Sequence, residues 1–295
     1  MGKIKKKDLD QKIYDLYDDY AHNKMDRKEF IEKLSLYAVG GLTVSSLLSF
    51  VLPNYKDHIQ VPENEEKLDT EFIVYDSPNG GGKIRAQLSR IKNKTRKLPG
   101  VIVVHENRGL NPHIADVGRR GAMEGFITIS PDALTPLGGY PGNDDDGRAL
   151  QRKRDRNEML EDFIAAFEYL KNHDECNGNI GVVGFCFGGW ISNMMAVKVN
   201  GLKAAVPFYG GQPPSELVQN INAALLLHYA ELDSRVNAGW PAYETALKKY
   251  HKEYTAYIYP NTNHGFHNDS TPRYDEAAAK LAWNRTVNFF TKKLQ

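Results

Sequence analysis

The sequence predicts an α/β fold in which a mostly parallel sheet is covered by helices on both faces. Three observations lead to this prediction. Short apolar runs rich in β-branched residues, such as 100–105 and 179–185, alternate with longer stretches of helical spacing. An apparent antiparallel pair of strands precedes this alternation. With 295 residues, 41% of them hydrophobic, the chain can also bury a large core.

Composition and cysteine usage narrow the classes of partner and compartment. The formal net charge of +1 argues against broad nucleic-acid binding, and the basic cluster Lys3–Lys7 is expected to be a solvated tail. Cys176 and Cys186 lie ten positions apart, and the second stands in a glycine-rich turn. We therefore expect no structural disulfide and a cytoplasmic protein. Because no Cys-x-x-Cys spacing occurs, no metal site is predicted, and no cofactor is expected.

Two units are predicted: an N-terminal helical and apolar extension at residues 1–60, and an α/β domain at residues 61–295. Aromatic and aliphatic residues at helical spacing indicate a short amphipathic helix over 9–22. Residues 34–52 contain no charged side chain. We interpret them as a helix packed on the larger domain or on a second copy of the chain, which would make a homodimer contact.

Two other interpretations of residues 34–52 stay open. Residues 26–31 resemble a weakened twin-arginine export signal with Lys28 in place of the second arginine, so export is the alternative to a cytoplasmic location. A cleaved signal is disfavoured because no small-x-small site follows. A membrane span is possible on length, but the glycines and serines of the segment make it weakly hydrophobic for membrane contact.

The elements of the larger domain follow in order after a turn-rich linker at residues 53–66. Residues 71–75 and 84–91 are predicted to form a hairpin through the glycine turn at 80–82. Strand and helix signals then alternate to the end of the chain. Further strands are predicted at 100–105, 126–130, 179–185, 203–208, 223–229 and 255–259, and helices at 113–124, 148–173, 190–199, 240–252 and 275–293.

The segment Gly184-Phe-Cys186-Phe-Gly188 has the pattern of a nucleophile elbow, with cysteine in place of the more usual serine. A strand that turns sharply into a helix forces the turn residue toward positive φ and requires small neighbours. The same geometry places Cys186 at a helix N-terminus, which favours the thiolate. The alternative is a glycine-rich structural turn around an inert buried thiol.

Two downstream residues complete a possible catalytic triad. Asp233 follows the predicted strand 223–229, and His264 follows the strand 255–259. Nucleophile, acid and histidine thus arrive in the order of an α/β-hydrolase, each at the carboxyl end of a strand. Glu231 is a competing acid. Taken singly, Asp233 is equally compatible with a turn and His264 with an ordinary loop histidine.

These motifs resemble the dienelactone hydrolase, or carboxymethylenebutenolidase, family of α/β-hydrolases. The resemblance covers about residues 65–295 and rests on residues 103–110, 184–189, 233–236 and 263–266. It implies an α/β-hydrolase fold and a carboxylic ester hydrolase that cleaves small esters or enol lactones through a cysteine nucleophile and a thioester. The alternatives are a general carboxylesterase with other acyl substrates and a catalytically idle member that acts as a binding module.

Further site residues follow from position and from this resemblance. By position, the backbone N–H groups of Phe187 and Asn107 form the oxyanion hole. The resemblance implies that Glu106 helps to activate the thiol, whereas the alternative pairs this carboxylate with a neighbouring arginine, Arg108 or Arg119. It also makes Arg273 the candidate for holding a substrate carboxylate, although its spacing departs from the family pattern.

Two remaining motifs resemble parts of metal sites, but neither is predicted to bind a metal. The acidic run at residues 143–147 resembles a fragment of a calcium loop but lacks the ligand spacing, so a solvated loop is expected. His267 follows His264 by three residues, but no carboxylate–histidine framework for a metal accompanies it.

Overall fold

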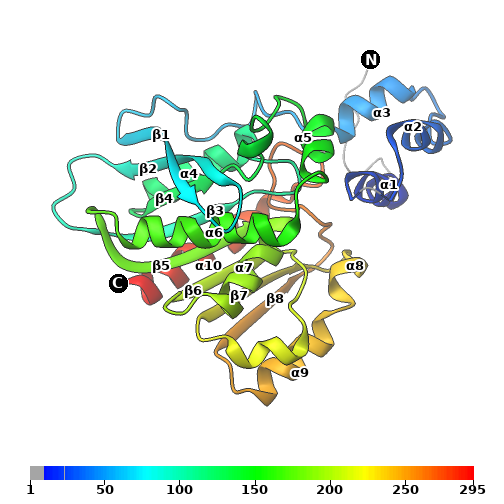
Figure 1. Ribbon diagram of the computed structural model, residues 1–295. Helices are drawn as coiled ribbons and strands as arrows, with labels where there is room; N and C mark the ends of the chain where they lie inside the picture. The colour runs from blue at the N-terminus through cyan, green and yellow to red at the C-terminus, as the bar shows by residue number, and fades with distance from the viewer. Residues whose placement is uncertain (1–9, 23) are drawn as a thin grey trace.

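The computed structural model describes residues 10–22 and 24–295, so the basic cluster Lys3–Lys7 lies outside the described residues. The described strands form one eight-stranded sheet in the order β1-β2-β4-β3-β5-β6-β7-β8 (Figure 1). The pairs β1–β2 and β2–β4 are antiparallel, and the other neighbouring pairs are parallel, which confirms the predicted fold class. The strands are β1 (Leu68–Ser77), β2 (Gly82–Ile91), β3 (Leu98–Val104), β4 (Ile127–Pro131), β5 (Cys176–Phe185), β6 (Ala204–Phe208), β7 (Ala224–Ala230) and β8 (Tyr254–Tyr259).

Helices cover both faces of the sheet. Successive side chains of β3 point to opposite faces and are apolar on both, so both faces have to be covered. Ile102 and Val104 pack into one apolar cluster, whereas Val101 and Val103 pack into another on the opposite face. Burying each such side chain contributes about 1.5–3 kcal/mol. The first face is covered by α6 (Arg156–Lys171), α7 (Phe187–Lys198) and α9 (Trp240–Lys249), and the second by α4 (Pro112–Met123) and α10 (Glu276–Leu294) (Figure 1).

The prediction of one long helix at 148–173 is wrong, because the structure has two helices there. α5 (Asp144–Gln151) precedes α6, and Asp155 caps α6 by accepting from the backbone N–H groups of Asn157 and Glu158. The acidic run at 143–147 is not a loop either. Asn143 caps α5, and the acidic residues fill its first turn, where the helix dipole stabilises negative charge.

The uncharged segment at 34–52 does not form one helix, which corrects the prediction. α2 (Arg27–Ser35) ends at its start, and α3 (Val44–Val51) occupies its second half. Between them Gly40 and Gly41 have φ of +61° and +90°, and Thr43 starts α3 with a capping box. Absence of charge marks a segment as apolar but says nothing about its backbone. In the described part of the chain, no helix is long and apolar enough to cross a membrane.

The N-terminal helices have an apolar cluster of their own. α1 (Gln11–Ala21), which agrees with the predicted helix over 9–22, joins α2 and α3 around the buried side chains of Tyr17, Phe30, Leu34 and Leu47. Figure 1 shows the three helices as a group beside the sheet, next to α5 and α8 (Ser234–Asn237). Short 3-10 turns occur at Thr135–Leu137 and Ser215–Asn220.

The strand order brings the loops that carry the candidate site to one edge of the sheet. β3, β5, β7 and β8 run parallel within the sheet, so their carboxyl ends lie at the same edge. Glu106 follows β3, Cys186 follows β5, Asp233 follows β7 and His264 follows β8. Active sites of open α/β sheets form at this edge.

Candidate active site

Cys186 stands at a tight turn between β5 and α7. Its φ is +57° and its ψ −110°, a conformation that a non-glycine residue adopts only where the surroundings enforce it. The neighbouring glycines are required by close backbone approach. A Cβ on Gly184 would lie 2.0 Å from the carbonyl oxygen of Gly188, and one on Gly188 would lie 2.4 Å from that of Val104. The geometry is that of a nucleophile elbow.

Asp233 and His264 form a buried pair beside this turn. Nδ1 of His264 lies 2.6 Å from Oδ2 of Asp233, and the two residues are 5% and 4% exposed. A ring nitrogen of His264 lies within 4.8 Å of the sulfur of Cys186. Glu231, the competing acid, is exposed and accepts a hydrogen bond from the backbone N–H of Asn261. Asp233 is therefore the acid that contacts the imidazole.

A second imidazole, which sequence reasoning missed, lies against the thiol. His22 follows α1, and its Nε2 is 3.2 Å from Sγ of Cys186. Its Nδ1 lies 2.8 Å from the carbonyl oxygen of Asp18 and 3.3 Å from its carboxylate. The ring meets that of His264 edge-on, with centroids 4.8 Å apart. The only sequence signal was the spacing of Asp18 and His22 by four positions at the end of a predicted helix.

The electrostatics of the pair favour an ionised sulfur. Burial would raise the pKa of Cys186, but the charges of His22 and His264 outweigh it and lower the pKa to about 5. For His264 burial acts in the opposite direction and would lower the pKa, but the charges of Asp233, Asp18 and Cys186 outweigh it and raise the pKa to about 10. Both shifts favour a thiolate beside an imidazolium at neutral pH.

Two backbone N–H groups are available near the sulfur. Phe187 begins α7, where the N–H groups of the first turn have no partner within the helix. Among the described residues, neither its N–H nor that of Asn107 makes a hydrogen bond. The side chain of Asn107 instead donates to the carbonyl oxygen of Ala21, 2.5 Å away, and so holds the end of α1 against the loop after β3.

Glu106 is buried beside the site but has other partners than the thiol. It accepts a hydrogen bond from Nδ2 of Asn268 at 3.0 Å and lies 3.7 Å from the guanidinium of Arg108. Burial would raise the pKa of Glu106, yet the charge of Arg108 lowers it, so the group is a carboxylate. Within the described residues no hydrogen bond joins it to Cys186. The contact with Arg108 matches the alternative given for it above.

Two arginines converge on a carboxylate of the chain itself. Nη1 of Arg273 lies 3.2 Å from Oδ1 of Asp18, and Nε of Arg235 lies 3.6 Å from Oδ2 of the same residue. Arg235, which sequence reasoning also missed, reaches to 3.2 Å from Nδ1 of His264. A cavity of about 270 Å³ separates α1 from these loops. Its lining includes Asp15, Asp18, Lys24, Asp233, Arg235, His264 and Arg273.

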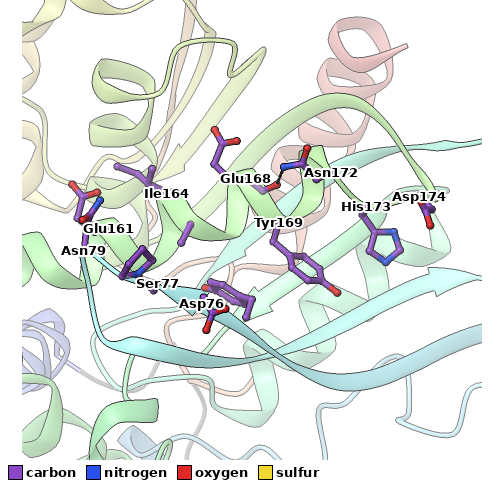
Figure 2. Close-up of a pocket in the computed structure, with 13 residues that line it drawn as sticks. Asp76, Ser77, Asn79, Glu161, Ile164, Glu168, Tyr169, Asn172, His173 and Asp174 are labelled. Carbon is purple, nitrogen blue, oxygen red and sulfur yellow. Dashed lines mark hydrogen bonds between the residues drawn. The ribbon is translucent and has the colours of Figure 1, made fainter.

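A separate groove of about 690 Å³ lies between β1 and α6 (Figure 2). Four carboxylates line it together with His173 and Tyr169, and the lining contains no lysine, arginine or cysteine. Figure 2 shows these side chains on a helix and on a neighbouring strand, and the serine of the lining, Ser77, donates to the carboxylate of Asp162. Among the described residues, no hydrogen bond joins this serine to His173, so the groove lacks a paired nucleophile and histidine. The chemistry of the described residues therefore points to the edge of the sheet that holds Cys186.

Comparisons with known proteins identify the family of the chain. The model of the "Dienelactone hydrolase family" matches residues 84–294, and a second one, "YqhI-like", matches residues 1–40. The chain is 32% identical over 258 residues to a protein of Saccharolobus solfataricus named "Putative carboxymethylenebutenolidase", covering 75% of this chain and 97% of the relative. It is 47% identical over 114 residues to the "Putative hydrolase fragment YghX" of Escherichia coli K12, covering 39% of this chain and 97% of that one.

Solved structures give the same picture. The crystal structure titled "Putative Dienelactone Hydrolase" from Klebsiella pneumoniae superposes with a TM-score of 0.67 at 27% identity, over 76% of this chain and 99% of that one. A dienelactone hydrolase-like promiscuous phosphotriesterase from metagenomic libraries has the same TM-score at 23% identity and shows the likeness of fold alone. With the family match covering most of the α/β domain, the chain is a hydrolase of the dienelactone hydrolase family.

Proposed function

We propose that the protein cleaves small carboxylic esters or enol lactones, with Cys186 as nucleophile and a thioester as intermediate. One observation carries the proposal: a thiol with a pKa lowered to about 5 stands at an elbow, beside a histidine held by a buried aspartate. A thiolate attacks acyl carbon without a prior proton transfer. Asp233 orients His264 and stabilises its protonated form.

The steps follow from these positions. The thiolate of Cys186 adds to the substrate carbonyl carbon, and the electron pair of the C=O bond moves to the oxygen. The N–H groups of Phe187 and Asn107 then donate hydrogen bonds to this oxyanion. Collapse of the adduct breaks the acyl C–O bond, and the departing oxygen takes the proton of His264. The now neutral His264 removes a proton from water, the hydroxide attacks the thioester, and the acid leaves as the thiolate is restored. Because a thiolate is itself a good leaving group, substrates with a stabilised leaving oxygen, such as enol lactones, are favoured.

Arg273 is the residue we propose for a substrate carboxylate. Its guanidinium is buried, and its carboxylate partner in the structure, Asp18, comes from α1. A substrate carboxylate would take the place of Asp18. Glu106 stays a prediction as the activating group: its contacts with Asn268 and Arg108 support a role in holding the loop after β3, and His22 is the group that contacts the sulfur.

The proposal is tested with a panel of enol lactones and activated esters. Wild type should turn over the lactones, and Cys186→Ala should not. Cys176→Ala is the matched control, because it removes the other thiol from the buried start of β5. Turnover of simple esters but not of lactones would favour a general carboxylesterase. No turnover by a folded wild type would contradict the enzyme and favour a binding module, for which the coverage of Cys186 by His22 is the supporting observation.

A cytoplasmic location and a homodimer remain predictions from the sequence. So does the division into an extension at 1–60 and a catalytic domain at 61–295. Ultracentrifugation of the full chain and of a chain lacking residues 1–56 tests the last two together. We expect the shorter chain to change in stability or in oligomeric state, because the truncation removes the contacts that His22 and Ala21 make with Cys186 and Asn107.

A further inference from the structure

Two carboxylate–histidine pairs meet at the sulfur of Cys186. His264 is held at Nδ1 by Asp233, 2.6 Å away. His22 is held at Nδ1 by the backbone and carboxylate of Asp18, and its Nε2 faces the sulfur at 3.2 Å. The ligand atoms of Cys186, His22 and His264 all lie within 4.8 Å of one another. The mechanism proposed above transfers protons through His264 alone, whereas His22 takes part only through its charge, which lowers the pKa of the thiol.

This donor set is the one that zinc prefers. Zn²⁺ binds thiolate sulfur and imidazole nitrogen at roughly 2.0–2.3 Å in tetrahedral geometry, so two donor atoms on one ion lie roughly 3.3–3.7 Å apart. The three atoms lie within 4.8 Å of one another, so the widest pair has to close by about 1–1.5 Å to reach that spacing. Carboxylates bonded to the second ring nitrogen are the usual outer partners of zinc-bound histidines, and both histidines have one here.

We propose that Cys186, His22 and His264 form a binding site for Zn²⁺ or a similar borderline-soft divalent ion. The site is assembled only when α1 is docked, because His22 supplies one ligand from the N-terminal helices. The bound ion occupies the nucleophile and fastens α1 over it, which switches the enzyme off. This last consequence rests on the function proposed above, whereas binding of the ion does not.

Burial and charge around the site support this assignment. His264 is 5% exposed, and its Nε2 has no hydrogen-bond partner among the described residues. The carboxylates of Asp18 and Asp233 face the site, and so do the guanidinium groups of Arg235 and Arg273. Nη2 of Arg235 lies 3.0 Å from Nε2 of His22 and has to move when an ion binds. Its side chain is 34% exposed, so solvent lies beside it.

The test measures metal binding directly. Full-length protein treated with chelator is titrated with zinc against a chromophoric competitor. Wild type should bind one ion, and His22→Gln should weaken binding at least tenfold, the size of effect that even outer partners of a metal have. His58→Gln, which removes an exposed histidine elsewhere in the chain, should leave the affinity unchanged. Arg235→Gln should tighten binding, because it removes a positive charge next to the ligands.

Cobalt reports the ligand type. Co²⁺ in wild type should show a sulfur-to-metal charge-transfer band that is absent from Cys186→Ala. Equal zinc affinity of wild type and His22→Gln, or a cobalt spectrum without that band, would overturn the site. If chelator-treated wild type turns over lactones but binds no zinc in the titration, the metal site is rejected and the proposed enzymatic function is kept. Zinc binding by a protein that shows no lactone turnover even after the metal has been removed would support the site and contradict the enzyme.

Discussion

Removing both imidazoles beside the thiol should change the pH dependence of Cys186 labelling. The variant should label more slowly than wild type below neutral pH and faster above it. The perturbation is the double variant His22→Ala with His264→Ala. Burial would raise the pKa of the thiol, but in wild type the two rings outweigh it and bring the pKa from its ordinary value of 9.0 down to about 5. At pH 6 about nine-tenths of the sulfur is therefore thiolate, against about one-thousandth in a thiol of ordinary pKa.

The labelling rate depends on the thiolate fraction and also on how nucleophilic the thiolate is. A thiolate of lower pKa is a weaker nucleophile, and a Brønsted coefficient of about 0.45 over this pKa difference makes the wild-type thiolate roughly 60-fold less reactive. At pH 6 the variant should therefore label about 15-fold more slowly than wild type. At pH 9 it should label tens of times faster, and the two profiles cross at about pH 7.

The assay is pseudo-first-order reaction with a small pyridyl disulfide from pH 4 to 10, in chelator so that no metal occupies the sulfur. Cys186→Ala gives the background from Cys176, which is buried and whose pKa is raised by burial. The single variants should lie between wild type and the double variant. A double variant with the wild-type inflection near pH 5 would refute the assignment of the low pKa to the two rings.

The other predictions concern the triad, the elbow and the N-terminal helices. Asp233→Asn should lower kcat by at least about 100-fold with the fold intact, because the histidine loses its orienting acceptor, as lactone assays and circular dichroism will show. Gly188→Ala should abolish turnover and cost about 1–3 kcal/mol in urea unfolding, since its Cβ would meet the carbonyl oxygen of Val104 at 2.4 Å. Leu34→Ala, at a fully buried position, should destabilise the N-terminal helices by about 2–5 kcal/mol and raise amide exchange in α1–α3, while exchange in β5 stays unchanged.

Local signals made much of the fold and the triad predictable. The strand that ends in Phe185 is a β-branched run followed by glycines that only a tight turn requires, and both properties are readable from neighbouring residues. Asp233 and His264 follow strands whose order alone places them at one edge. The dienelactone hydrolase family was recognisable for the same reason.

Distant contacts and caps were not predictable in this way. His22 lies 164 positions from Cys186, and no periodicity connects the two. Arg235 lies in the short helix α8, and only the position of α1 gives it Asp18 as partner. The split before α6 falls in the polar run 151–158, whose charged residues suit an exposed helix surface as well as a loop, and the carboxylate of Asp155 decides where the helix begins.

The contact between α1 and the elbow has a consequence for the order in which the protein assembles. α1–α3 have a cluster of their own and are made before the strands of the sheet, whereas His264 and Arg273 are made after β8. Contacts between segments so far apart in the chain are slow to form. The surroundings of Cys186 are therefore completed only after all eight described strands have been made, and we expect the thiol to pass through a stage with fewer charged neighbours before the N-terminal helices dock.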